Sequence, residues 1–486
     1  MVHFFSLYKE SFLWAAVGML LGGCHATYPT ELSGFQTAYR SGGFNDAVEI
    51  AQKAQQENSR TSLVWTLECA NAQRSAGKLA ESVKSFEAAE DYFRDADAAA
   101  DFSLSQEGLA TFSNPYQIEY RGRNLDRIFG ATYEALSLIE LGETERARVA
   151  LTRSLFRQDD ARRIAQDRAR LEKQEAAAIS KEDTQFQARN NDARLAEARA
   201  KVHANFDKTT TYANAMNPFA VWLNGIYYLQ TAEGPADLER ARKSLDQASK
   251  LAPKNPFIEA DLKLATESNA RPNPDDGKSV VYVIHESGLA PRWSEYVVTL
   301  PLIYGDPLAP LVNLALPEIS PEPLSFGLVE VSGKDLPRTP LATLADVDGI
   351  VYAEFREEYP IARNRAIASA TMKAVAGYVA NKAASDNAKR RGRDPNAEFV
   401  LLATLMATNA YGTMSARADL RNWSTLPQEI QMGRFVIPKG STLNLSGGAL
   451  KGTMPCPLPK ARVVLVTIRS ISPQIPAIVR TSILQP

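Results

Sequence analysis

In the second half of the chain, one histidine and one pair of carboxylates could carry chemistry. His285 is followed by Glu286, but no second histidine completes an H-E-x-x-H zinc motif, and no G-x-S-x-G nucleophile elbow is present. Asp346 and Asp348 could serve acid–base work, but Leu344–Gly349 also fits a turn with a helix cap. We favour a strand-edge or turn position for His285 and the turn for both carboxylates. We therefore predict no catalytic residue and no enzyme activity.

The composition and the motif spacing argue against a metal site, a nucleotide site or a nucleic-acid site. The 486 residues include three cysteines and four histidines, which argues against a metal site built from them. The glycine-rich stretch Ser446–Gly452 lacks P-loop spacing, and a net charge of −1 gives no general attraction to nucleic acid. We expect no metal, no cofactor and no nucleic-acid partner. Cys69 and Cys456 could pair in an oxidising compartment, although burial alone also explains Cys69.

The third cysteine, Cys24, lies where a thiol could be modified. Residues 1–23 contain a run from Ser11 to Leu21 that is too short to span a bilayer but typical of a signal peptide. Leu21-Gly22-Gly23-Cys24 resembles the lipobox of bacterial lipoproteins, in which the cysteine receives a diacylglycerol and becomes the mature N-terminus. We predict lipidation of Cys24. An ordinary signal peptide cut nearby is the alternative. The residue after the cysteine is His25 and not Asp, and in this the chain resembles lipoproteins that are sorted to the outer membrane.

A pattern of small residues recurs in the alanine-rich region from Pro29 to Leu264. A glycine is followed five residues later by Ala or Ser, four residues after that by an apolar residue, and three residues further by Ala or Ser. This spacing is the second-helix signature of a tetratricopeptide repeat (TPR). Such small residues let two antiparallel helices pack closely. We predict TPR-like helical repeats over residues 24–267, with a generic helical bundle as the alternative. The copies are Gly42-Ala47-Ala51-Ala54, Gly77-Ser82-Phe86-Ala89, Gly142-Ala147-Leu151-Ser154, and Ala241-Leu245-Ala248 preceded by Gly225.

Residues 153–207 interrupt the repeat spacing. The segment is rich in Arg, Glu, Gln, Asp and Ala and has neither proline nor glycine. This composition predicts a long helix or a helical hairpin that projects from the repeats. We favour a solvated charged surface, with a contact arm for a partner as the alternative.

The composition changes at residues 268–278, which contain two prolines and a glycine and indicate a linker. The region that follows, 279–486, is richer in β-branched residues. Ser279–His285 and Glu295–Leu302 are expected to form a β-hairpin. Leu341–Asp348 is expected to be a short connecting helix.

Two helices are predicted later in the same region. Glu354–Lys389 has helical periodicity, and its basic end, Lys389–Arg393, suits a helix C-terminus. Pro395–Tyr411 is apolar on most sides and is expected to be buried. Strands return after residue 434. The predicted fold class is α+β, with N-terminal TPR-like helical repeats followed by a mixed domain with a mostly antiparallel sheet.

The loop after the second of these helices concentrates Asp419, Arg421 and Trp423. In the interpretation that we favour, Trp423 fills a hydrophobic gap while Asp419 and Arg421 pair locally. The alternative is a partner-binding loop, since Trp and Arg dominate interface hot spots.

Short motifs on both sides of these helices resemble one family of bacterial proteins. Glu286–Pro291 leading to Leu300-Pro301, together with Ala418–Pro427, is similar to a family of proteobacterial TPR-containing outer-membrane lipoproteins. Its members are sometimes encoded beside lipoproteins that activate penicillin-binding proteins. The resemblance implies a role in the cell envelope and no catalytic residue.

The leading functional hypothesis is a non-enzymatic, membrane-anchored lipoprotein on the periplasmic face of the outer membrane. It would act as a scaffold or regulator that binds envelope proteins on the concave face of its repeats, and the resemblance connects it to peptidoglycan synthesis. A first alternative is a peptidoglycan- or polysaccharide-binding module that uses Asp346, Asp348 and Trp423. A second is an assembly factor of an envelope secretion or pilus system.

Overall fold

The computed structural model describes most of the chain between Thr27 and Pro486. The predicted signal peptide, Cys24, most of the 153–207 segment and nearly all of the 268–278 linker lie outside the described residues. The described residues are 27–103, 115–161, 163, 196–197, 200, 216–267, 277–301, 306–323, 326–392 and 394–486.

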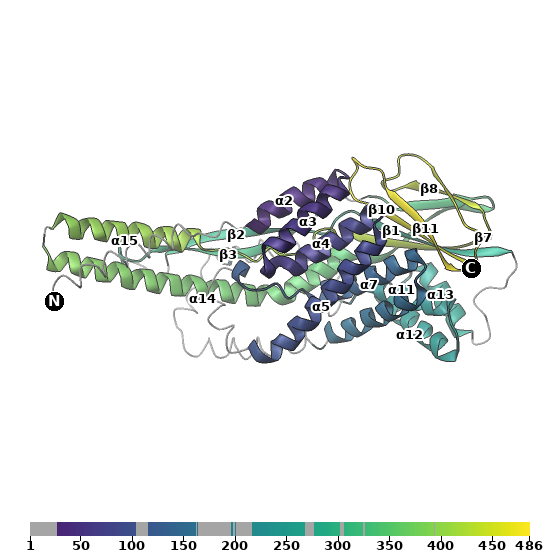
Figure 1. The fold of residues 1–486 in the computed structure, drawn as a ribbon, viewed down its shortest axis with the longest axis horizontal. Helices are drawn as coiled ribbons and strands as arrows, with labels where there is room; N and C mark the ends of the chain where they lie inside the picture. Colours follow the sequence, from purple (N-terminus) through teal and green to yellow (C-terminus); the bar gives the residue numbers. More distant parts are fainter. Residues whose placement is uncertain are drawn as a thin grey trace.

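The N-terminal half consists of antiparallel helix pairs, which confirms the predicted TPR-like repeats (Figure 1). The small and apolar positions of all four sequence copies are buried in the second helix of each pair. Gly42, Gly77 and Gly142 take φ values of 85°, 80° and 78°, so each ends a first helix in the left-handed region that glycine favours. The pairs are α2 (Thr27–Arg40) with α3 (Phe44–Glu57), α4 (Ser62–Ser75) with α5 (Leu79–Ser103), α7 (Asn124–Leu141) with the helical segment 144–161, and α11 (Pro218–Gln230) with α12 (Pro235–Leu251), followed by α13 (Pro256–Thr266).

The described strands of the C-terminal half form three sheets. A five-stranded sheet has the order β11-β10-β1-β7-β6, in which only β1 and β10 are parallel. A four-stranded sheet has the order β5-β4-β8-β9, and β2 and β3 form a separate ribbon. The strands are β1 (Lys278–Ser287), β2 (Arg292–Pro301), β3 (Leu311–Ser320), β4 (Val329–Gly333), β5 (Leu336–Pro340), β6 (Ala342–Asp346), β7 (Glu429–Pro438), β8 (Thr442–Gly447), β9 (Met454–Pro457), β10 (Val463–Ser470) and β11 (Ile478–Gln485).

The five-stranded sheet is the middle of three layers. On β1, Val280 and Tyr282 belong to a hydrophobic core shared with the helical repeats. Val281, one residue along, belongs to a second core shared with the four-stranded sheet. Successive side chains of a strand point to opposite faces, so one apolar strand serves both cores. The predicted α+β fold with a mostly antiparallel sheet is confirmed, and the helices and the sheet share one continuous core.

Two local predictions in this half are wrong. β1 does not form a hairpin with β2, because β1 pairs with β7 and β10 while β2 pairs with β3. A strand that is apolar on both faces belongs in the centre of a covered sheet, and neighbouring position along the chain was a poor guide to its partner. Leu341–Asp348 is not a helix. Its residues form the edge strand β6 and the first turn of the next helix.

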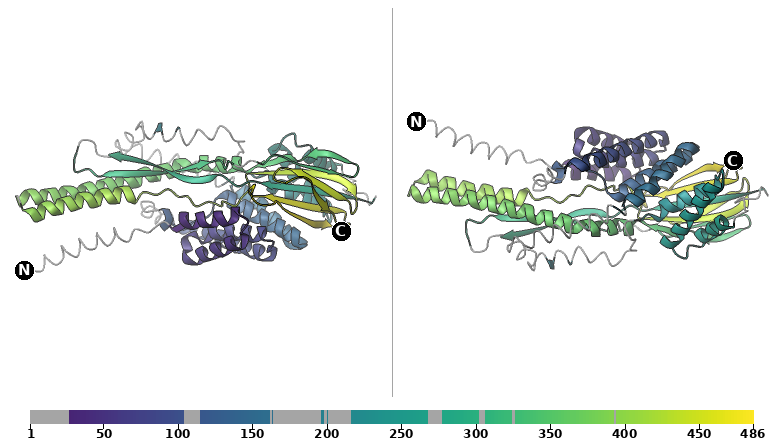
Figure 2. Two further views of the ribbon diagram at one scale, coloured as in Figure 1. Left: turned by 90° about the horizontal axis from the view of Figure 1, so that it is seen from above. Right: turned by 90° about the horizontal axis from the view of Figure 1, so that it is seen from below.

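A long helical hairpin projects from the body of the molecule (Figures 1 and 2). It consists of α14 (Val347–Arg390) and α15 (Pro395–Met414). The first turns of α14 enter the main core through Phe355 and Tyr359, and its middle packs on the β2–β3 ribbon. The expectation that Pro395–Tyr411 is buried is wrong, because only Ala397 and Gly412 of α15 are buried. Among the described elements, α15 packs mainly on α14 and, near its C-terminal end, on β3, and several of its large apolar side chains are exposed.

Candidate functional site

His285 is fully buried two residues before the end of β1, the central strand of the five-stranded sheet, and does not lie in a turn or on an edge strand as the sequence suggested. Gln431 Oε1 accepts the Val329 N–H, so it also accepts the His285 Nδ1–H, at 3.0 Å. Nε2 is then unprotonated and accepts the Ser470 hydroxyl at 2.9 Å. Burial lowers the pKa of His285 to about 4. This serine–histidine pair has the hydrogen bond of a nucleophile and base, but no substrate could reach it inside the sheet.

The carboxylates Asp346 and Asp348 have different structural roles. Asp346 caps α14, because its Oδ1 accepts the Gly349 N–H at 2.9 Å, as the cap interpretation predicts. Asp348 is buried and accepts a hydrogen bond from Gln428 at 3.0 Å. Burial raises the pKa of Asp348 to about 8. Within the described ranges, no three or more His, Cys, Asp or Glu side chains are grouped to hold a metal ion.

Cys69 and Cys456 are both buried and both free. Cys69 belongs to the core between the repeats and the sheet, and Cys456 belongs to the core between the two sheets. The bridge that the sequence allowed is absent from the described structure, and burial accounts for both thiols.

Asp419, Arg421 and Trp423 lie in a segment that we call the strap, residues 418–427, which connects α15 to β7. Trp423 is 2% exposed, and its ring lies 5.9 Å from the rings of both Phe86 and Tyr133. The structure therefore places Trp423 in the core, where it cannot stack on a sugar or a partner. The local packing interpretation describes it correctly.

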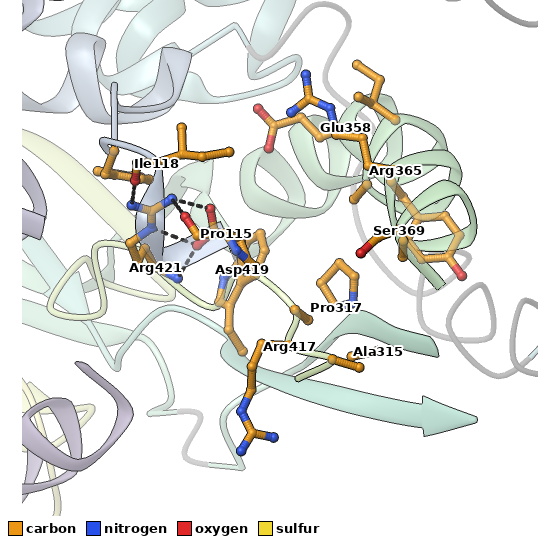
Figure 3. Close-up of a pocket in the computed structure, with 18 of the residues that line it drawn as sticks. Pro115, Ile118, Ala315, Pro317, Glu358, Arg365, Ser369, Arg417, Asp419 and Arg421 are labelled. Carbon is orange, nitrogen blue, oxygen red and sulfur yellow. Dashed lines mark hydrogen bonds and ion pairs between the residues drawn. The ribbon is translucent and has the colours of Figure 1, made fainter. Parts of the chain in front are cut away.

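Arg421 is buried and holds the strap against the loop that precedes α7 (Figure 3). It pairs with Asp419 at 2.7 Å and donates to the carbonyl oxygens of Ile118 and Pro115 at 2.7 and 3.2 Å. Its guanidinium also lies 5.3 Å from the Tyr120 ring centroid. The Asp419–Arg421 pair that the sequence indicated therefore makes an intramolecular contact that holds the strap on the loop.

Glu68 on α4 fastens the next part of the strap. Its Oε1 accepts the Ser424 N–H and hydroxyl, both at 2.6 Å, and its Oε2 accepts those of Thr425 at 3.2 and 2.6 Å. Burial raises the pKa of Glu68 to about 7, and these four hydrogen bonds act in the opposite direction. Asn71, one turn further along α4, donates to the Thr425 carbonyl at 2.9 Å.

These contacts show that the face shared by the first helices of the repeats is occupied. Every residue of α4 and α11 is buried, as is α7 from Asn124 to Ile139. The strap covers this face beside α2, α4 and α7, and Trp222 of α11 packs against Tyr282 of β1. The concave surface that we expected to bind a partner is therefore filled by the chain itself.

A buried charge network joins the same helices to the sheet. Arg74 of α4 lies 2.9 Å from Glu286 of β1 and 3.2 Å from Glu140 of α7. Arg469 of β10 donates to the carbonyl oxygens of Gly288 and Thr425 at 2.6 and 3.1 Å. Removal of one partner would leave an uncompensated buried charge, so loss of a residue from this network should weaken the contact between the two halves.

The helical hairpin has an unusual distribution of side chains. Small residues of α14 face inward and are buried, whereas large apolar residues of both helices face outward. Phe399, Met406 and Met414 are 68%, 66% and 74% exposed. The buried small residues are Ala370, Ala374, Gly377, Asn381, Ser385 and Ala388. The exposed large residues are Met372, Val375, Val379, Phe399, Leu402, Met406, Tyr411 and Met414.

Each helix therefore presents an apolar stripe to solvent. Residues 372, 375 and 379 have spacings of three and four, as do residues 399, 402 and 406, so each set lies on one helix face. Glu398 is the one charged residue of α15. The apolar composition of α15 predicts a buried helix, whereas the structure exposes many of its large apolar side chains.

No family model matches the chain, and no curated protein matches it. A solved structure that does match is the crystal structure of a tetratricopeptide repeat protein from Parabacteroides merdae ATCC 43184. The match covers 49% of this chain and 99% of that chain, with 16% sequence identity and a TM-score of 0.14. At that TM-score the likeness supports no argument, and the repeat fold rests on the helix pairs described above. None of the described helices is long and apolar enough to cross a membrane.

Proposed function

We propose that this protein is a non-enzymatic lipoprotein scaffold of the bacterial cell envelope that binds a partner protein through the α14–α15 hairpin. The observation that carries the proposal is the pair of apolar stripes, centred on Val375 and Leu402, on a projecting arm. Soluble monomers rarely expose large contiguous apolar surface, and such surface typically marks an interaction site. Because the strap and the sheet already cover the inner face of the repeats, we expect the partner site on the projecting α14–α15 hairpin.

The chemistry of the stripes indicates the kind of partner. Apolar residues with spacings of three and four fit the apolar face of a partner helix. Methionines such as Met372, Met406 and Met414 suit an adaptable contact surface. The partner is then an envelope protein with an exposed amphipathic helix, and regulators of peptidoglycan synthesis are the class that the family resemblance implies.

The proposed anchor rests on the sequence Leu21-Gly22-Gly23-Cys24. A Cys24→Ala variant should appear in the soluble periplasmic fraction or keep its signal peptide, because the acyl chains that hold the protein on the membrane are missing. Fractionation of cells with an antibody to the protein measures this. A variant that stays in the membrane fraction like the parent protein would rule out the lipid anchor and the outer-membrane location inferred from it.

The partner site is tested by site-specific photo-crosslinking in cells. A photoreactive residue at Phe399 should yield a discrete crosslinked product that a Leu402→Asp and Met406→Asp double variant loses. The matched control is Val436, an exposed apolar residue of β7, which should give no such product. Because the substituted side chains are exposed, thermal unfolding should be unchanged within a few degrees.

Two crosslinking results would contradict the proposed partner site. If the well-folded protein gives no specific product at Phe399, or if the double variant gives the same product, the arm is not the partner site. Mass spectrometry of the product distinguishes a peptidoglycan-synthesis regulator from a component of a secretion or pilus system.

A further inference from the structure

A cleft of about 360 Å³ lies at the root of the helical hairpin (Figure 3). Its walls come from four parts of the chain: the loop 115–123, the β2–β3 ribbon, the middle of α14, and residues 415–421. Small-molecule sites typically measure 300–1,000 Å³ and form where separate elements meet. The proposed partner site further along the hairpin makes no use of this cleft.

One face of α14 gives the cleft a column of hydrogen-bond donors. Arg365, Ser369 and Lys373 all line it, and their spacing of four residues places them above one another on the helix. With a rise of about 1.5 Å per residue, neighbouring members of the column are about 6 Å apart. Figure 3 shows the Ser369 hydroxyl directed toward the cavity.

The lining carries more positive than negative charge. Six cationic residues and three acidic residues, Glu119, Glu358 and Asp419, contribute to the lining. The cations are Arg121, Arg123, Arg365, Lys373, Arg417 and Arg421. Arg123 pairs with Glu358 at 3.1 Å, Arg417 with Glu295 at 3.3 Å, and Arg421 with Asp419 at 2.7 Å.

Two cations of the column have no carboxylate partner among the described residues. Arg365 makes no ion pair or hydrogen bond there, and Lys373 donates to the Ser415 carbonyl oxygen at 3.2 Å. Burial lowers the pKa of Lys373, since its charge is partly removed from water without a counter-charge. An ammonium group has three donors, so Lys373 can still bind an anion.

Apolar side chains also line the cleft. Ala315 and Pro317 on β3 and Ala416 on the segment after α15 offer small side chains, and Trp293 and Phe355 add aromatic surface. The cleft therefore suits a ligand that has an apolar part besides its charge.

We propose that this cleft binds a small organic anion, whose carboxylate or phosphate is held by Arg365, Ser369 and Lys373 and whose apolar part packs against the ribbon and the aromatic side chains. The site is independent of the hairpin stripes, so either proposal can fail without the other.

Isothermal titration calorimetry with simple aromatic probes tests the proposal. Benzoate and phenyl phosphate carry the two anionic groups, and benzamide is a neutral match for benzoate. At least one anion should bind, and benzamide should bind at least tenfold more weakly, because it forms no charge-assisted hydrogen bond. The better of the two anions identifies a carboxylate or a phosphate ligand.

Three variants decide whether the cleft is the site. An Arg365→Gln and Lys373→Gln double variant should lose at least tenfold in anion affinity, and Ser369→Phe should abolish binding by filling the cavity. Lys382→Gln, an exposed lysine of α14 outside the cleft, is the control and should bind as the parent does. No anion binding by the folded parent protein, equal affinity for benzamide, or undiminished binding by both cleft variants would each overturn the proposal.

Discussion

The most informative perturbation of this fold is Trp423→Ala in the strap. Trp423 is 2% exposed, packs against both Phe86 and Tyr133, and donates its Nε1–H to Thr425 at 3.0 Å. Truncation of a buried Phe or Trp to Ala costs about 3–5 kcal/mol, a figure that already includes the lost aromatic contacts. We therefore expect the free energy of unfolding to fall by about 4 kcal/mol, a large part of the 5–15 kcal/mol typical of a domain.

Urea denaturation followed by far-ultraviolet circular dichroism measures this change. Phe399→Ala is the matched control, because that aromatic residue is exposed and its truncation should alter stability by about 0.5 kcal/mol or less. Since the strap belongs to the core that joins the repeats to the sheet, the helical and strand signals should shift together. A loss below about 1 kcal/mol, or a shift confined to one signal, would show that the repeats fold without the strap.

Two further predictions concern the interior. His285 has a pKa lowered from 6.5 to about 4, so the unfolded chain takes up a proton before the folded protein does. The stability that the neutral imidazole contributes is therefore present above pH 6.5 and is lost as the pH falls toward 4, by about 1.4 kcal/mol per pH unit. Urea midpoints measured from pH 7 to pH 4 should fall less steeply for His285→Gln than for the parent protein. Parallel slopes for the two proteins would contradict the buried neutral state. A Cβ on Gly225 would lie 2.8 Å from Leu245 Cγ, whereas nothing lies within 4 Å of one on Gly34 of α2. Both Ala substitutions gain helix propensity, but Gly225→Ala should be about 1–3 kcal/mol less stable than Gly34→Ala by thermal unfolding, and equal stabilities would show that α11 and α12 do not pack as closely as described.

The helical repeats were predictable because their signal is local. The spacing from Gly42 to Ala54 requires a turn, a close helix contact and a small interior residue, and all of these lie within one helix pair. The apolar run of β1 likewise predicted a strand. The fold class followed from these two kinds of segment.

Pairings between distant segments were not predictable in the same way. β1 meets β10 at Val280 and Val463, 183 residues away, and no local pattern specifies that partner. The apolar composition of α15 predicts burial, but among the described elements only the C-terminal part of this helix reaches β3, and the rest packs against α14. An apolar sequence indicates a surface that needs a partner, and it does not say whether that partner belongs to the same chain.

The strap illustrates the same ambiguity with the opposite outcome. Trp and Arg in a loop predict an interface, and Arg421 and Trp423 do form one, but with the repeats of their own chain. A partner that binds the inner face would first have to displace the buried Trp423 and break the four hydrogen bonds to Glu68. A single partner helix would recover little of the free energy that this displacement costs, because the first helices would lose a segment that already fits them. Binding at the exposed stripes of the hairpin requires no such exchange, and we therefore expect partners to bind on the arm.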